Sequence, residues 1–267
     1  MIPKIIHYCW FGGKELPDKY KHYIETWRKY CPDYQIKEWN EKNFDIEQSD
    51  YAKEAYQEKK WAFVSDYARL KIIYEEGGIY LDTDVELVKS LDDLLDEKCF
   101  LASEKTGYIA TGLGFGAEKN NEIIRMMLEE YKGRHFIGKN GVYDHTACPK
   151  RNTKPLQKYG YKFNPDEIVR IKDAIVFPPS YFDPMDSTSG DINISENTYT
   201  IHHYSASWIS DEDNVQNKKI DEIVKNNCLI MGQLKKQWFL YCVQKEKGMS
   251  KSFIKYLVSK LQLKLNL

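Results

Sequence analysis

Hydrophobic and polar positions follow two different periods along the chain, and together they predict a mixture of strands and helices. Short apolar runs of strand type lie at residues 2–8, 34–40, 79–88 and 99–104. Mixed apolar and charged segments with helical spacing lie at residues 18–30, 51–76 and 121–133. This order, with its alternation of strand and helix, predicts an α/β domain with a mainly parallel sheet.

The second half of the chain has a looser pattern. After about residue 135 it is rich in Pro, Asn and Asp, and YTIHHYSASW (199–208) predicts one further strand. From about residue 216 onward the pattern is helical. We therefore expect a domain of residues 1–215 and a C-terminal helical extension of residues 216–267.

Composition narrows the class of protein. The chain has 267 residues, 42% of them hydrophobic, and a net charge of −1, which suits one large α/β domain and gives no basic field for nucleic acid. The six cysteines form no C-x-x-C pair, so zinc and thioredoxin-type sites are not indicated. The N-terminal apolar run is too short for a signal peptide, and no apolar window is long enough to span a membrane. We expect a cytoplasmic protein.

The stretch GGIYLDTDVE (77–86) places two carboxylates directly after an apolar strand. Residues two apart in a strand share a face, so Asp82 and Asp84 are expected to project together at a strand end, where α/β sheets bind ligands. Adjacent carboxylates raise each other's pKa unless a cation lies between them, and Mg²⁺ or Mn²⁺ suits such a pair. The pair therefore predicts a divalent metal that holds a phosphate. Taken alone, Asp-x-Asp is more often a solvated turn.

Three segments extend this pattern to a known family. The chain resembles glycosyltransferase family 32 in three segments: SDYARLKIIYEEGGIYLDTD (65–84), the opening IPKIIHYCWFGG (2–13) and IHHYSASW (201–208). That family includes yeast Golgi mannosyltransferases and bacterial capsule and lipopolysaccharide enzymes, and is similar to the catalytic domain of clostridial glucosylating toxins. The resemblance covers about residues 1–210. It implies a GT-A fold, a Rossmann-like α/β sandwich, that binds a nucleotide-sugar through a divalent metal and retains the anomeric configuration.

The resemblance also implies roles for the matching residues. Asp84 would be a direct metal ligand, and Asp82 would contact the ribose and the metal shell. The third ligand would be His202 or His203, of which only one is expected to reach the metal because neighbours on a strand point opposite ways. The catalytic group would comprise Asp66, Arg69, Asp82 and Asp84. The donor pocket would comprise His7, Tyr8, Trp10, Asp66, Arg69, Tyr80, Asp82, Ser207 and Trp208.

These roles predict a metal-dependent retaining glycosyltransferase. The metal and Arg69 would stabilise the charge of the departing diphosphate. The donor would be a UDP-sugar or GDP-mannose carrying a hexose, and the acceptor a glycan or lipid-linked glycan of a bacterial capsule or lipopolysaccharide. A covalent nucleophile would be one of Glu104, Asp144 and Asp183, and a front-face mechanism without a nucleophile is equally open.

Two other functions compete with this prediction. A catalytically silent sugar-binding or scaffold protein would not need a costly pair of carboxylates. GLGFGA (112–117) fits the G-x-G-x-x-A pattern of dinucleotide binding, but it lies in mid-chain and no acidic residue ends a following strand. A tight glycine turn beside the donor or acceptor pocket is the better interpretation.

The C-terminal residues 249–267 generate a first prediction. They combine apolar positions at near-helical spacing with several lysines, which is typical of a helix on an anionic membrane at the inner face of the plasma membrane. A terminal helix packed on the domain explains the pattern equally well. If the membrane interpretation holds, deleting residues 249–267 will release the protein from anionic vesicles in a co-sedimentation assay. Unchanged binding would contradict it.

Overall fold

The chain divides into two compact units in a computed structural model that describes residues 1–138, 141–186 and 190–205. The first unit comprises residues 1–136 and 145–205, and the second comprises residues 137–144 and 206–267. In the described part of the second unit, Ile137 and Tyr143 form an isolated antiparallel bridge. The predicted C-terminal helices lie outside the described residues. No helix in the described ranges has both the length and the apolar character needed to cross a bilayer.

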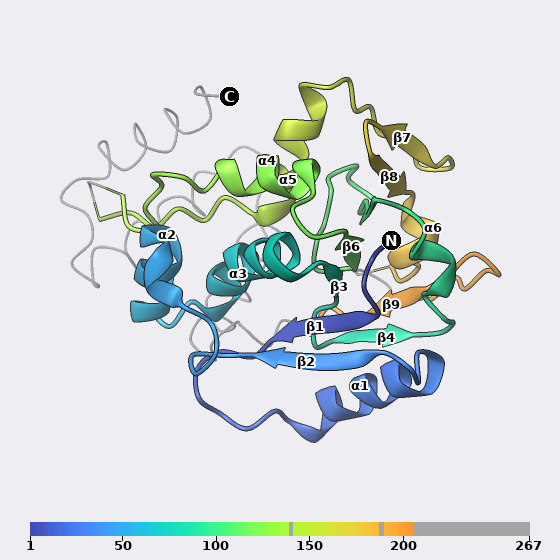
Figure 1. The fold of residues 1–267 in the computed structure, drawn as a ribbon, viewed down its shortest axis with the longest axis horizontal. Helices are drawn as coiled ribbons and strands as arrows, with labels where there is room; N and C mark the ends of the chain where they lie inside the picture. Colours follow the sequence, from blue (N-terminus) through green and yellow to red (C-terminus); the bar gives the residue numbers. More distant parts are fainter. Residues whose placement is uncertain (139–140, 187–189, 206–267) are drawn as a thin grey trace, which may run out of the picture. The chain divides into compact units, whose positions relative to one another are not determined.

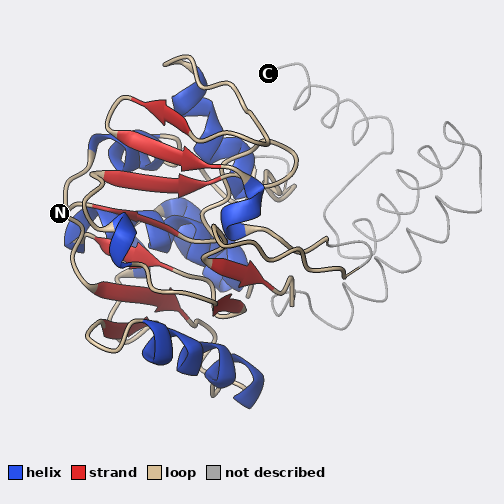
Figure 2. Cartoon of the chain, turned by 90° about the vertical axis from the view of Figure 1, so that its right-hand side faces the viewer, coloured by secondary structure: helices blue, strands red, loops and turns tan. Residues whose placement is uncertain are grey.

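The first unit is built on a mixed sheet flanked by helices (Figure 1). Its strands are β1 (Ile5–Cys9), β2 (Gln35–Trp39), β3 (Gly78–Tyr80), β5 (Cys99–Ala102), β6 (Phe115–Ala117), β7 (Val169–Ile171) and β8 (Ala174–Phe177). They are hydrogen-bonded in the order β2-β1-β3-β6-β5-β8-β7, and Figure 2 shows the strands of the sheet stacked side by side. The short strands β4 (Val85–Leu87) and β9 (Thr200–His202) form a separate two-stranded sheet. The expected α/β class is confirmed.

The helices are α1 (Asp18–Tyr30), α2 (Asp50–Gln57), α3 (Trp61–Glu76), α4 (Glu122–Glu129), α5 (Cys148–Gln157) and α6 (Pro179–Phe182), with 3₁₀ turns η1 (Ile46–Gln48) and η2 (Asp92–Leu94). The predicted helix over 18–30 is confirmed. The single helix expected over 51–76 is wrong, because α2 ends before Lys59, which has a positive φ of 56°. Left-handed backbone cannot continue a right-handed helix, so a second helix begins at Trp61.

The sheet is not mainly parallel, which corrects the sequence prediction. β1 pairs in parallel with β2 and β3, and β5 pairs in parallel with β8. However, β6 lies antiparallel between β3 and β5, and β7 is antiparallel to β8. Gly116 permits this insertion, because a Cβ at that position would lie 2.5 Å from the ring of Phe100 on the neighbouring strand. Glycine there leaves room for this ring against β6.

Side chains that alternate along the strands point to opposite faces of the sheet, and each face is covered by a different layer. Ile6 and Ile79 belong to a buried core with Ile24 and Trp27 of α1, whereas α3 packs against the strands from the other side (Figure 1). The indole Nε1–H of Trp27 also donates to the carbonyl of Val85 at 2.8 Å, which ties α1 to β4. The core therefore fixes both the end of β3 and the start of β4, and the two aspartates lie between them.

His7 lies inside this framework rather than at its edge. It is fully buried, its Nε2 is 3.0 Å from the carbonyl oxygen of Gly77, and its Nδ1 accepts from Trp39 Nε1–H at 3.0 Å. A Cβ on Gly78 would lie 2.8 Å from the same Nε2, so the imidazole is closely enclosed. One donor and one acceptor partner suit a neutral imidazole. We therefore no longer expect His7 to contact a nucleotide.

The burial of His7 generates a pH prediction. Burial lowers the pKa of His7 from 6.5 to about 4, so between these values the unfolded chain binds the extra proton. The wild type should lose stability as the pH falls from 6.5 to 4, by up to about 3 kcal/mol more than a His7→Gln variant. Urea unfolding at several pH values measures this difference. The exposed His22→Gln is the control and should follow the wild type. Equal pH slopes for wild type and His7→Gln would contradict the prediction.

Candidate active site

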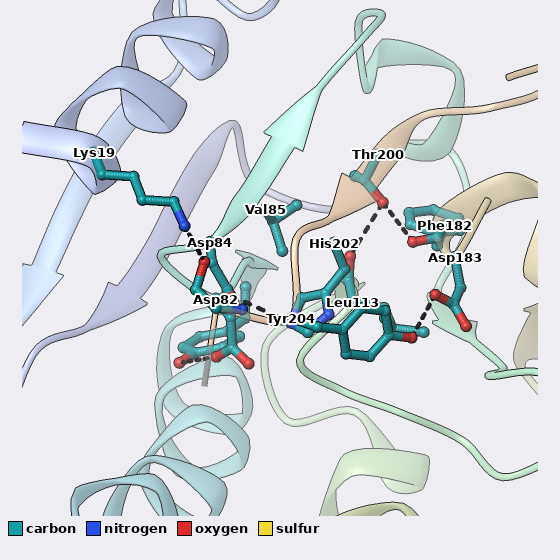
Figure 3. A network of polar contacts seen from close by, with 12 residues as sticks. Lys19, Asp82, Asp84, Val85, Leu113, Phe182, Asp183, Thr200, His202 and Tyr204 are labelled. Carbon is teal, nitrogen blue, oxygen red and sulfur yellow. Dashed lines mark hydrogen bonds and ion pairs between the residues drawn. The ribbon is translucent and has the colours of Figure 1, made fainter. Parts of the chain in front are cut away.

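Two carboxylates and one imidazole converge where β3, β4 and β9 meet (Figure 3). Asp82, Asp84 and His202 each offer a ligand atom, and these atoms lie within 4.8 Å of one another. β4 pairs with β9 so that Val85 lies opposite His202. The Nε2 atom of His202 is 3.2 Å from Asp84 Oδ1. The other ring nitrogen, Nδ1, is buried without a hydrogen-bond partner among the described residues. This donor set fits a divalent ion of the Mn²⁺ or Mg²⁺ type.

The two aspartates converge for a different reason from the one predicted. Strand β3 ends at Tyr80, and residues 83 and 84 form a turn in which the Val85 N–H donates to the Asp82 carbonyl at 3.0 Å. The chain then leaves the large sheet as β4. The alternation of a continuous strand is therefore not what brings the carboxylates together. The turn does so.

Arg69 holds the deeper side of the site. Its side chain is almost fully buried, and its Nη2 lies 3.1 Å from Asp66 Oδ1 and 3.3 Å from Asp82 Oδ1. Its Nε–H donates to the Ser65 carbonyl at 3.0 Å, and its guanidinium lies 5.0 Å from the ring centroid of Tyr80. Tyr80 Oη donates to Asp82 Oδ1 at 3.0 Å. Asp66 and Arg69, three residues apart, thus share one face of α3, and most of the donor capacity of Arg69 is committed to these contacts.

The environment shifts the pKa values of the carboxylates in different directions. Burial raises the pKa of Asp82 and of Asp66, although Arg69 favours their charged forms. Burial also acts on Asp84, but the hydrogen bonds from His202 and from the Ser205 N–H outweigh it and hold its pKa below the usual value. Asp84 is therefore the better stabilised anion, while Asp82 gains most from an added cation.

His203 points away from the cluster. Its Nε2 lies 2.9 Å from Glu86 Oε2, and its ring stacks on Tyr23 at a centroid distance of 4.5 Å. Of the two adjacent histidines, His202 is the one that lies beside the aspartates, so it is the one that we keep as the proposed third ligand. The proposal of His203 as a ligand is corrected, because its imidazole contacts Glu86 rather than the two aspartates.

Tyr204 is a site residue that sequence reasoning missed. It has a positive φ of 44°, which is uncommon for a bulky residue and costs free energy. Its hydroxyl donates to the buried Asp183, and its ring meets His202 edge-on at 4.4 Å. The turn that it makes lets the next N–H, of Ser205, donate to Asp84 Oδ2 at 2.8 Å. No residue spacing in the sequence signals this conformation.

The remaining predicted residues are more dispersed. Tyr8, near the carboxyl end of β1, donates its hydroxyl to Glu38 at 2.7 Å. Trp10, the residue after β1, donates its Nε1–H to the Lys14 carbonyl at 2.8 Å. Of the three suggested nucleophiles, Asp183 is joined to the site through Tyr204, Glu104 accepts a hydrogen bond from Thr106, and Asp144 belongs to the second unit. Ser207 and Trp208 lie outside the described residues.

The glycine-rich run 112–117 lies directly beside Asp82. The Gly112 carbonyl accepts from the Asp82 N–H at 3.3 Å, and a Cβ on Gly112 would lie 2.3 Å from Asp82 Oδ2. The run continues into strand β6 rather than opening a helix, so the dinucleotide-binding interpretation is wrong. The expected glycine turn is present, and it makes room for the carboxylate.

Comparison with known proteins agrees with this geometry. Residues 17–101 match the family described as "Glycosyltransferase sugar-binding region containing DXD motif". The chain is 26% identical over 203 residues to inositol phosphoceramide mannosyltransferase 1 of Schizosaccharomyces pombe, covering 68% of this chain and 60% of that relative. It is 24% identical over 122 residues to lactosylceramide 4-alpha-galactosyltransferase of Rattus norvegicus, covering 46% and 32% of the two chains. The chain thus spans less than two thirds of either relative.

Among solved structures, the chain is similar to the PaToxG glycosyltransferase. The sequence identity is 22% and the TM-score is 0.46, with 59% of this chain and 69% of that chain covered.

The contact between Gly112 and Asp82 generates a third prediction. In Gly112→Ala the added methyl displaces the Asp82 carboxylate, so Mn²⁺ should bind about tenfold more weakly, as when a ligand loses its support. Titration of Mn²⁺ into folded protein, followed by calorimetry, measures this. Gly133→Ala is the control: its φ of 66° imposes backbone strain, but its Cβ would meet nothing within 4 Å. Wild-type Mn²⁺ affinity in Gly112→Ala would show that the displacement does not occur.

Proposed function

We infer, from the premise that residues 17–101 carry a glycosyltransferase sugar-binding region containing the DXD motif, that this protein is a metal-dependent glycosyltransferase. The observation that carries the proposal is the convergence of Asp82 and Asp84 with His202, from a strand more than 100 residues away in the sequence. A solvated Asp-x-Asp turn would not recruit a half-buried imidazole from a distant strand. The two carboxylates and the imidazole suit a metal that holds a nucleotide diphosphate.

Each side chain of the site has a task in this proposal. A divalent ion, when bound, supplies positive charge that stabilises a departing diphosphate. Asp84, held by His202 and the Ser205 N–H, is the primary ligand, and Asp82, held by Arg69 and Tyr80, is the second. Their supports keep both carboxylates oriented before the ion arrives, which reduces the cost of ordering them on binding.

Asp66 and Arg69 form the sugar side of the proposed donor pocket. Asp66 is only 8% exposed and faces Arg69 across 3.1 Å, so its remaining acceptor capacity can take hydroxyl groups of the donor sugar. Arg69 orients Asp66 and Asp82 relative to each other. We keep its proposed role toward the donor, but its contacts make it first a positioning residue for these two carboxylates.

The proposed reaction moves a hexose from a nucleotide-sugar, a UDP-sugar or GDP-mannose, with retention of configuration. Asp183 is the carboxylate that we retain as a nucleophile candidate, because Tyr204 links it to His202. A front-face mechanism is the alternative.

We further propose a lipid-linked glycan as the acceptor. The names of both relatives describe hexosyltransferases that act on ceramide lipids. A role in bacterial surface polysaccharide synthesis, at the cytoplasmic face of a membrane, rests on the family resemblance and on the basic C-terminal segment.

A panel of UDP- and GDP-sugars with purified protein and Mn²⁺ tests the proposal, with release of the nucleotide as the readout. One donor should be hydrolysed slowly, and chelation of the metal should abolish release. Asp84→Asn should lower the rate by about 100-fold or more, because it removes a ligand that carries charge. The exposed Asp96→Asn is the matched control and should behave as wild type. Absence of both release and metal-dependent nucleotide binding would favour the sugar-binding or scaffold alternative.

A further inference from the structure

A lysine from α1 reaches the edge of the metal-ligand cluster (Figure 3). Lys19 Nζ donates to Ser205 Oγ at 2.9 Å, across 186 residues of sequence. The backbone N–H of the same Ser205 donates to Asp84 Oδ2 at 2.8 Å. Ser205 therefore links the ammonium group of Lys19 to Asp84, the proposed primary metal ligand. The sequence motifs did not indicate that α1 contributes to the site.

The charges of the site show why a cation is needed at this position. Asp66, Asp82 and Asp84 bring three negative charges, and Arg69 contacts two of these carboxylates directly. A divalent ion would neutralise the two charges that remain. The diphosphate of a nucleotide then adds at least two more negative charges. Arg69 and the ion could neutralise these charges only by losing their contacts with the carboxylates. A further positive group with free donors would stabilise the bound diphosphate.

Lys19 has the donors that this task requires. An ammonium group carries three N–H donors, and among the described residues Lys19 makes the hydrogen bond to Ser205 and no ion pair. Its neighbour on the same helix differs: Lys21 Nζ pairs with Glu15 at 2.8 Å and Asp18 at 3.1 Å. Lys21 is thus neutralised on the surface, whereas Lys19 keeps its charge available beside Asp84.

We propose that Lys19 binds phosphate oxygens of the nucleotide-sugar donor, and that it stabilises the diphosphate when the sugar leaves. The inference rests on the proposed function, because it assumes a nucleotide diphosphate at Asp82 and Asp84. Lysine recognises phosphate as a compact point charge, so the contact does not depend on the base. Ser205 holds the ammonium at the rim of the site until the donor binds.

Calorimetric binding of UDP and of GDP in the presence of Mn²⁺ tests this inference, with uridine as a probe that lacks phosphate. Lys19→Gln should weaken binding of UDP and GDP by the same factor, about three- to tenfold, since an exposed charged contact is partly screened. Lys19→Arg should restore most of the affinity, because it keeps the charge. Lys21→Gln is the matched control on the same helix and should bind as wild type. Uridine binding and Mn²⁺ binding without nucleotide should not change in any of these variants.

The outcomes separate this inference from the proposed function. If the wild type binds neither UDP nor GDP with Mn²⁺, the proposed function fails and the inference with it. If the wild type binds them and Lys19→Gln binds equally well, the role of Lys19 alone is overturned. Loss of Mn²⁺ affinity in Lys19→Gln without nucleotide would also overturn it, because Lys19 would then act by supporting Ser205 and Asp84.

Discussion

Repulsion between buried carboxylates is the constraint on which the rest of the site depends. Asp66 and Asp84 are buried and Asp82 is half-buried, and the charge of Asp84 raises the pKa of Asp82 beyond the effect of burial. Buried anions are tolerated only when partners compensate their charge. Each surrounding feature supplies part of that compensation: Arg69 between two carboxylates, the His202 imidazole and the Ser205 N–H on Asp84, and the Tyr80 hydroxyl on Asp82. The compensation is incomplete, which is the condition for binding a divalent ion.

The fold meets this constraint by ending one strand pairing and beginning another. β3 is held between β1 and β6, and β4 leaves the large sheet to pair with β9. The turn between them carries Asp82 and Asp84 with their backbone already hydrogen-bonded, and Gly112 leaves space for the Asp82 side chain. Tyr204, in a strained conformation, completes the arrangement by turning Ser205 toward Asp84. Strain of this kind is found where surrounding contacts over-determine the backbone, as they do at functional sites.

The cations of the site have different tasks. Arg69 is buried and its contacts are fixed, so it neutralises and orients carboxylates of the protein itself. Lys19 is exposed and retains free donors, so its charge is available to a ligand. An arginine suits the first task because its planar fork can bridge two carboxylates, and a lysine suits the second because its ammonium can follow a moving phosphate.

Local periodicity and residue type determined much of this protein from sequence alone. They predicted the helix over 18–30, the strand at residues 34–40, the position of Asp82 and Asp84 just after an apolar strand, and the opposite directions of His202 and His203. These features depend on neighbours within a few residues, and side-chain spacing reports such neighbours directly.

Only the tertiary structure decided which distant residues meet. The antiparallel insertion of β6, the burial of His7 against Trp39, the choice of His202 and the approach of Lys19 to Ser205 all arise from long-range pairing. Strand order and register in a mixed sheet follow from how whole faces bury together, and no local pattern encodes that choice.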